Sequence, residues 1–155
     1  MSPKVSVVIP TYNNAALLCE TLDGVRQQTF KDFEIIVVDD GSKDNTSDVV
    51  ASYDPTIHYL EQTNQGPAAA RNNGVILAQG EFIAFCDHDD VWNERHLESL
   101  LAVFAAHPAA AMVFDDAQYF GERVATEEPH IGAKVVPSMV GKSVPIRRIW
   151  QCWVA

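Results

Sequence analysis

Three carboxylates stand within four positions in Asp87-His88-Asp89-Asp90, directly after the apolar run at residues 82–86. A buried strand that ends in acids delivers them to the rim of a sheet. Carboxylate oxygens are the ligands that Mg²⁺ and Mn²⁺ prefer, commonly together with phosphate oxygens of a substrate. The stretch therefore predicts a site for a divalent cation and a diphosphate. The alternative is a polar loop in which Asp89 or Asp90 only caps the next helix.

Two further apolar runs end in acidic pairs. Asp39-Asp40 follow residues 34–38, and Asp115-Asp116 follow residues 111–114. The carboxyl ends of parallel strands meet at one edge of a sheet, where α/β proteins bind their ligands. We therefore expect these acids to share one edge with those at 87–90, and this edge is the predicted site.

Strand-type and helix-type patterns alternate along the first 120 residues. Short β-branched or apolar runs predict strands at 5–9, 34–38, 57–60, 82–86 and 111–114. Apolar residues at helical spacing predict helices between them, with starts near Asn13 or Asn14, near Thr46, at Pro67 and near Asn93. This alternation predicts the α/β class, with a mainly parallel sheet flanked by helices on both faces.

Beyond residue 120 the pattern changes. Residues 121–142 predict a long loop, with a short strand at Val135-Val136. Apolar residues at 146, 149, 150 and 153 then predict an amphipathic helix over Pro145–Val154, whose apolar face packs on the sheet or contacts a partner or membrane surface. We therefore divide the chain into an α/β domain at 1–120 and a loop with a helix at 121–155.

Charge and cysteine content exclude several classes of protein. The net charge of −10, with Arg147-Arg148 as the basic cluster, argues against general binding to nucleic acid or to anionic membranes. Cys19, Cys86 and Cys152 are odd in number and fit neither a disulfide framework nor a zinc site. The sequence shows no secretory signal and no apolar segment of the ~18 residues that a membrane span needs. We expect a cytoplasmic protein with no nucleic-acid partner and no membrane span.

Five stretches together resemble family 2 glycosyltransferases in residue type, order and spacing. They are VSVVIPTYN at 5–13, QTF at 28–30, EIIVVDDGS with DNT at 34–46, NQG with ARN at 64–72, and DHDD at 87–90. The resemblance covers about the first 115 residues. It implies the Rossmann-like nucleotide-diphospho-sugar transferase fold, incomplete at the C-terminus. It also implies an inverting, metal-dependent transferase that uses a nucleotide-diphosphate sugar.

The resemblance implies roles for residues that follow the first two strands. Pro10, Thr11 and Tyr12 would cradle the nucleotide base, for which an exposed threonine hydroxyl and an aromatic face are suitable. Ordinary turn chemistry is the alternative. Asp40 would accept a hydrogen bond from a uracil imide, which favours a UDP-sugar. Asp39 beside it is the weaker candidate, because it would cap the next turn.

It implies further roles around the acidic cluster. Arg71 would bind the sugar diphosphate, with a surface ion pair as the alternative. Asp87 and Asp89 form the Asp-X-Asp motif, in which one carboxylate contacts the ribose and another holds Mn²⁺ or Mg²⁺. The direct metal ligand stays open between Asp89 and Asp90. His88 fills the variable position of this nucleotide-sugar-binding motif. Alternation along an extended segment would point it away from its neighbours, as a spacer rather than a metal ligand.

No general base is identified. In similar enzymes it lies downstream of the Asp-X-Asp motif, in a longer chain. Carboxylates at 115, 116, 127 and 128 are available, but none stands in the sequence context that the family uses. We therefore expect the chain to be the donor-binding portion of such an enzyme, either truncated or a short natural protein. Residues 121–155 would begin the acceptor side.

The resemblance also implies partners, and two alternative functions are to be considered. The acceptor would be a glycan or a lipid-linked molecule in polysaccharide or cell-surface glycan biosynthesis. Association with the inner face of the membrane stays open. The alternative function is a non-catalytic nucleotide-binding module. A dinucleotide-dependent oxidoreductase is disfavoured, because residues 10–14 lack the GxGxxG that close approach of a pyrophosphate needs.

Overall fold

The computed structural model describes residues 2–114, 134–137 and 148–151. The strands are β1 (Val5–Thr11), β2 (Phe33–Asp39), β3 (His58–Glu61), β4 (Phe82–Phe85), β5 (Ala110–Phe114), β6 (Lys134–Pro137) and β7 (Arg148–Gln151). The helices are α1 (Ala15–Arg26), α2 (Thr46–Tyr53), α3 (Pro67–Leu77) and α4 (His96–Ala106). Strand and helix alternate as far as β5, as the sequence predicts.

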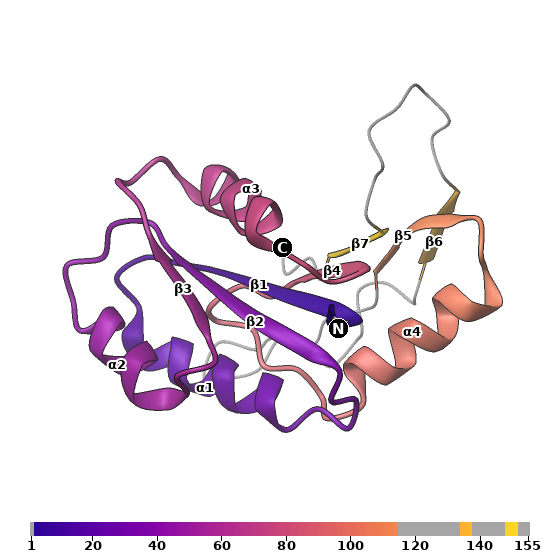
Figure 1. Cartoon of the computed structure of the whole chain (residues 1–155), viewed down its shortest axis with the longest axis horizontal. Coiled ribbons are helices and arrows are strands. Elements are labelled where there is room, and N and C mark those ends of the chain that lie inside the picture. Colours follow the sequence, from indigo (N-terminus) through magenta and orange to yellow (C-terminus); the bar gives the residue numbers. More distant parts are fainter. Residues whose placement is uncertain (1, 115–133, 138–147, 152–155) are drawn as a thin grey trace, which may run out of the picture.

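The strands form one sheet in the order β3-β2-β1-β4-β7-β5-β6 (Figure 1). Every neighbouring pair is parallel except β5 and β6, which run antiparallel. Helix α3 lies on one side of the sheet, and α1, α2 and α4 lie on the other (Figure 1). The prediction of an α/β fold with a mainly parallel sheet is therefore confirmed.

The helix predicted over Pro145–Val154 is wrong for residues 148–151, which form β7. This strand lies between β4 and β5 and is parallel to both. An extended segment there gives both neighbours a hydrogen-bonding partner, and this long-range pairing outweighs the helical spacing of the apolar residues. The strand predicted at Val135-Val136 is confirmed as β6. The proposed boundary at residue 120 lies outside the described residues.

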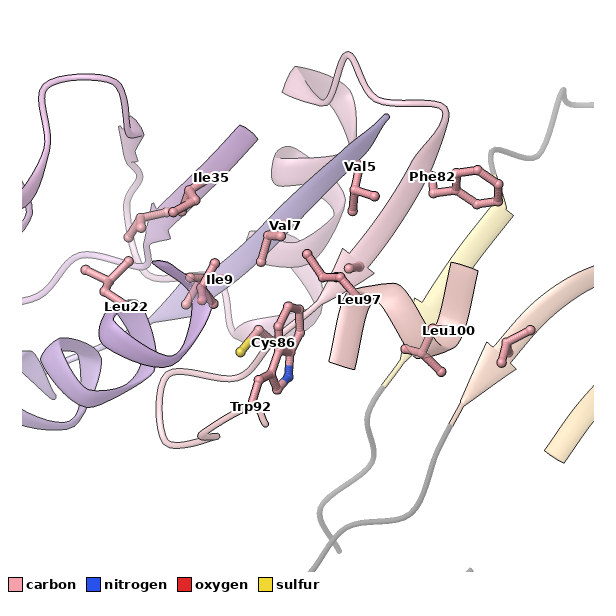
Figure 2. Close-up of a cluster of buried hydrophobic side chains, with 14 of the residues drawn as sticks. Val5, Val7, Ile9, Leu22, Ile35, Phe82, Cys86, Trp92, Leu97 and Leu100 are labelled. Carbon is pink, nitrogen blue, oxygen red and sulfur yellow. The ribbon is translucent and has the colours of Figure 1, made fainter. Parts of the chain in front are cut away.

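The larger hydrophobic cluster fills the space between the sheet and helices α1, α2 and α4. Alternate β1 residues Val5, Val7 and Ile9 face this side and are fully buried, together with Leu22 of α1 and Leu97 of α4 (Figure 2). Burying a side chain of this size stabilises the fold by about 1.5–3 kcal/mol. This packing fixes the position of β1 and therefore of its carboxyl end.

A smaller cluster lies under α3, on the opposite face. Val8 of β1 and Ile36 of β2 pack there against Ala70 of the helix. A Cβ atom at Gly74 would stand 2.3 Å from Val8 Cγ1, so glycine allows α3 to approach the sheet closely. This approach sets the position of the helix that carries Arg71.

Gln28, the first residue of the QTF stretch at 28–30, has a structural role. Gln28 is fully buried, and its Nε2 donates to the carbonyl of Asn93 at 2.7 Å and to that of Gly24 at 3.1 Å. Its Oε1 accepts a hydrogen bond from the backbone N–H of Leu97 at 3.0 Å. Gln28 therefore anchors both the start of α4, which begins at His96, and the loop from β4 that carries the acidic cluster.

Candidate functional site

A hollow of about 330 Å³ opens at the carboxyl ends of β1, β2 and β4. The chain leaves β1 towards β2 and β3 and then returns to the opposite side of β1 as β4, so the strand order reverses at this point. Parallel α/β sheets bind ligands at such reversals. The lining residues are Pro10, Thr11, Tyr12, Asp40, Asn64, Gly66, Pro67, Ala70, Arg71, Asp87, His88 and Asp89. Eight of the ten residues predicted for the site therefore line one hollow. Asp39 and Asp90 do not.

Asp39 turns inward and supports the edge of the sheet. Its side chain is buried, with Oδ1 accepting from the backbone N–H of Ser42 at 2.8 Å and Oδ2 accepting from the Tyr59 hydroxyl at 2.6 Å. Burial, and then the hydrogen bond to Asp39, raise the pKa of Tyr59 above its ordinary value. Both oxygens of Asp39 therefore have structural partners away from the hollow.

Asp40 organises the loop between β3 and α3. Its Oδ1 accepts from Gln62 Nε2 at 2.7 Å and from the backbone N–H of Gln65 at 2.8 Å, and its Oδ2 accepts from the N–H of Gly66 at 2.8 Å. Gly66 has a φ of 87°, a conformation that glycine adopts without strain. The sequence predicted a turn at 64–66 but gave no signal that Gln62 would contact Asp40.

Arg71 reaches the hollow from α3 and pairs with the acidic cluster. Its Nη2 donates to Asp87 Oδ1, and both side chains are partly exposed. Among the contacts of the described residues, Arg71 Nε is buried without a hydrogen-bond partner. A guanidinium carries several N–H donors in a planar fork that matches phosphate oxygens. Arg71 thus has donor capacity left after pairing with Asp87.

Asp89 and Asp90 face different environments. Asp89 is exposed at the hollow, whereas Asp90 is buried and its Oδ2 accepts from the backbone N–H of Asp87 at 3.3 Å. Burial raises the pKa of Asp90 to about 6. A charged ligand that enters the hollow therefore meets Asp89 rather than Asp90.

His88 also lines the hollow, contrary to the expectation that it points away from its neighbours. The backbone turns at this point, with Asp90 N donating to the Asp87 carbonyl at 3.0 Å, so the alternation of an extended strand does not apply. His88 Nδ1 lies 3.3 Å from the carbonyl oxygen of Pro10. Because a carbonyl oxygen only accepts, Nδ1 is the donor in this contact, and Nε2 takes no part in it.

Tyr12 stands at the lip of the hollow. Tyr12 is 43% exposed, whereas Thr11 is 2% exposed, so the exposed threonine hydroxyl expected from the sequence is buried. The next residue, Asn13, has a φ of 50°. Its N–H donates to Ser42 Oγ at 2.8 Å, and its Oδ1 accepts from Lys43 N at 2.6 Å. These bonds tie the loop after β1 to the loop after β2 and fix the place of Tyr12.

The described residues hold no group of three or more His, Cys, Asp or Glu side chains that could bind a metal ion alone. Two carboxylates, Asp87 and Asp89, do line the same hollow. Mg²⁺ and Mn²⁺ often bind through one or two protein carboxylates and take their other ligands from substrate phosphates and water. The donor set therefore fits a cation that binds together with a diphosphate.

The family of the chain follows from its sequence. Residues 6–146 match the family model described as glycosyl transferase family 2, and the chain belongs to that family. Its relatives include the validoxylamine A glucosyltransferase of Streptomyces hygroscopicus subsp. jinggangensis, 46% identical over 117 residues that cover 72% of this chain and 28% of the relative. The glycosyltransferase GlyG of Streptococcus pneumoniae serotype 4 is 40% identical over 104 residues, 64% of this chain and 35% of GlyG.

Solved structures share the fold. S. aureus TarS 1-349 in complex with UDP superposes with a TM-score of 0.71 and 32% identity, covering 79% of this chain and 38% of TarS. The mannosyltransferase PcManGT from Pyrobaculum calidifontis, in complex with GDP-Man and Mn²⁺, superposes with a TM-score of 0.66 and 30% identity, covering 77% and 36%. The resemblance to family 2 and to its nucleotide-sugar transferase fold is therefore confirmed. The chain spans between 14% and 35% of the length of eight curated relatives that it matches.

Proposed function

We propose that the chain is the donor-binding part of an inverting glycosyltransferase that uses a nucleotide-diphosphate sugar, in the first place a UDP-sugar, together with Mn²⁺ or Mg²⁺. One observation carries the proposal: the guanidinium of Arg71 and the carboxylates of Asp40, Asp87 and Asp89 line one hollow at the reversal of strand order. The family supports transfer of a sugar, and neighbours of the same fold bind UDP, UDP-GlcNAc or GDP-Man.

Different residues would bind the base, the ribose and the diphosphate of the donor. Asp40 would accept the imide N–H of the base, and Tyr12 would offer its ring to the base from the lip of the hollow. Asp87 would contact the ribose. Arg71 would place its remaining N–H groups on the diphosphate, where a positive charge stabilises a leaving group as it becomes more negative.

Asp89 would hold the divalent cation, because it faces the hollow while Asp90 is buried behind it. When bound, the cation would neutralise charge on the departing nucleotide diphosphate. Asp90 would instead support the backbone of Asp87 from behind. His88, beside them, would present Nε2 to the donor.

The sugar acceptor is part of the same proposal. Transfer to a glycan or lipid-linked hydroxyl requires a general base. The acids considered for it at 115, 116, 127 and 128 lie outside the described residues. No helix in the described part of the chain is long and apolar enough to cross a membrane.

Calorimetric titration of the chain with UDP, with and without Mn²⁺, tests the proposal. We expect binding that depends on the metal and that weakens about tenfold or more in Asp89→Asn, because a carboxylate ligand of the cation is lost. Asp32→Asn is the matched control, since Asp32 is exposed and precedes β2 at the opposite edge of the sheet. Absence of binding by any nucleoside diphosphate, or equal binding without metal, would refute the proposed site.

A further inference from the structure

The carboxylate of Asp40 is almost fully occupied before any ligand binds. Its Oδ1 accepts two hydrogen bonds, from Gln62 Nε2 and Gln65 N, and its Oδ2 accepts one, from Gly66 N. An ionised carboxylate has about four acceptor positions, two on each oxygen. Among the described residues these three are the donors to Asp40, so one acceptor position is left for a ligand, on Oδ2.

Two of the three donors are backbone N–H groups, which a side-chain substitution does not remove. The third is the amide of Gln62, and a second contact fixes its orientation. Gln62 Oε1 accepts from Asn73 Nδ2 of helix α3 at 2.6 Å, so the Nε2 end of the Gln62 amide faces Asp40. The hydrogen bonds from Asn73 to Gln62 and from Gln62 to Asp40 therefore keep one acceptor position of the carboxylate occupied.

We propose that Gln62 is a specificity-determining residue that restricts the donor to bases with a single N–H on the edge that meets Asp40. The inference rests on the proposed function, in which Asp40 binds the base. Uracil presents one such group, the imide N–H. Guanine presents two neighbouring donors, a ring N–H and an exocyclic amino group, which together require two acceptor positions.

The fold alone does not decide this choice. Solved structures of similar fold contain UDP or GDP-Man. Gln62 acts through Asp40 rather than on the ligand, so it is a positioning residue. Its effect is therefore visible in the discrimination between bases, and not in affinity alone.

Inosine diphosphate separates hydrogen-bond count from size. Hypoxanthine has the ring N–H of guanine but lacks its exocyclic amino group, and the two bases are otherwise the same. With one acceptor position open, the chain should bind IDP about fivefold more tightly than GDP, because the amino group of guanine is buried without a partner. UDP should bind more tightly than either purine nucleotide.

Titration calorimetry of the full chain with UDP, IDP and GDP, each with Mn²⁺, tests the inference. Gln62→Met keeps the length of the side chain and removes its donor, so the preference for IDP over GDP should disappear or reverse. Asn73→Ala removes the anchor of the Gln62 amide and should reduce the preference in the same direction. Gln27→Met makes the same chemical change at the exposed end of α1, at the opposite edge of the sheet, and should leave the ratio as in the wild type.

The outcomes separate this inference from the proposed function. If UDP binds but the wild type binds GDP as tightly as IDP, the role of Gln62 is refuted and the donor site stands. An IDP to GDP ratio that is the same in the wild type, Gln62→Met and Asn73→Ala refutes it equally. If no nucleoside diphosphate binds, the donor site and the role of Gln62 both fail.

Discussion

Replacing Asp40 with asparagine should destabilise the fold even when no nucleotide is present. The carboxylate accepts hydrogen bonds from Gln62 Nε2, Gln65 N and Gly66 N at 2.7–2.8 Å. An asparagine offers one carbonyl oxygen, so at least one of these donors would face the amide NH₂ instead. A hydrogen bond to a charged group contributes about 1.5–3 kcal/mol, and the bonds that survive lose the charge.

The removal of a buried charge offsets part of this loss. We therefore expect the free energy of unfolding to fall by about 2–3 kcal/mol in Asp40→Asn. For a chain of this size that corresponds to a melting temperature lower by about 4–12 °C. Differential scanning calorimetry without nucleotide or metal measures the change.

Asp32→Asn is the control for the same chemical substitution at an exposed position, and its melting temperature should match that of the wild type. If Asp40→Asn also had the melting temperature of the wild type, the three hydrogen bonds would not stabilise the loop at 62–66. The count of hydrogen bonds to Asp40, on which the proposed role of Gln62 rests, would then be wrong.

Two further predictions concern parts of the fold outside the hollow. Gly80→Ala should lower the free energy of unfolding by about 1–3 kcal/mol in urea denaturation, because the new Cβ would stand 2.6 Å from the backbone N of Ser6; an unchanged midpoint would contradict this. Asp44→Asn should be less stable than the wild type at neutral pH, and the difference should shrink as the pH falls through about 4. Hydrogen bonds from Thr46 and from the N–H of Ala15 lower the pKa of Asp44 below its ordinary value of 3.8, so its contribution is complete above that value and is lost as the pH falls from there through the lowered pKa. A difference in urea midpoint that is independent of pH would rule this out.

The sheet was largely predictable because its central strands are runs of apolar residues, interrupted only by Ser6 in the first. Val5–Ile9, Ile35–Val38 and Phe82–Ala84 are buried on both faces, and such runs read as parallel strands without any knowledge of their partners. Strand β7 was not predictable in the same way. Its extended conformation depends on β4 and β5 as neighbours, whereas the spacing of apolar residues around it is that of a helix.

The types of site residue were predictable, but their orientations were not. Acids at strand ends and an arginine near the start of a helix could be found from order and spacing. That Asp89 faces the hollow while Asp90 is buried depends on a backbone turn at 87–90. The role of Gln62 depends on hydrogen bonds that join residues 22 and 11 positions apart, to Asp40 and to Asn73. Such contacts leave no periodic signal in the sequence.

The position of β7 determines the order in which the sheet can be completed during synthesis. Strands β1 to β4 pair among themselves, so this part of the sheet needs no strand beyond residue 85, and helix α4 covers one of its faces. In the described structure, β5 pairs only with β6 and β7, and it is joined to β4 through β7 alone. Until residues 148–151 have left the ribosome, the edge of β4 and the edge of β5 both carry unpaired backbone groups. Open strand edges are sites of aggregation, so we expect a chain that lacks residues 148–151 to aggregate more readily.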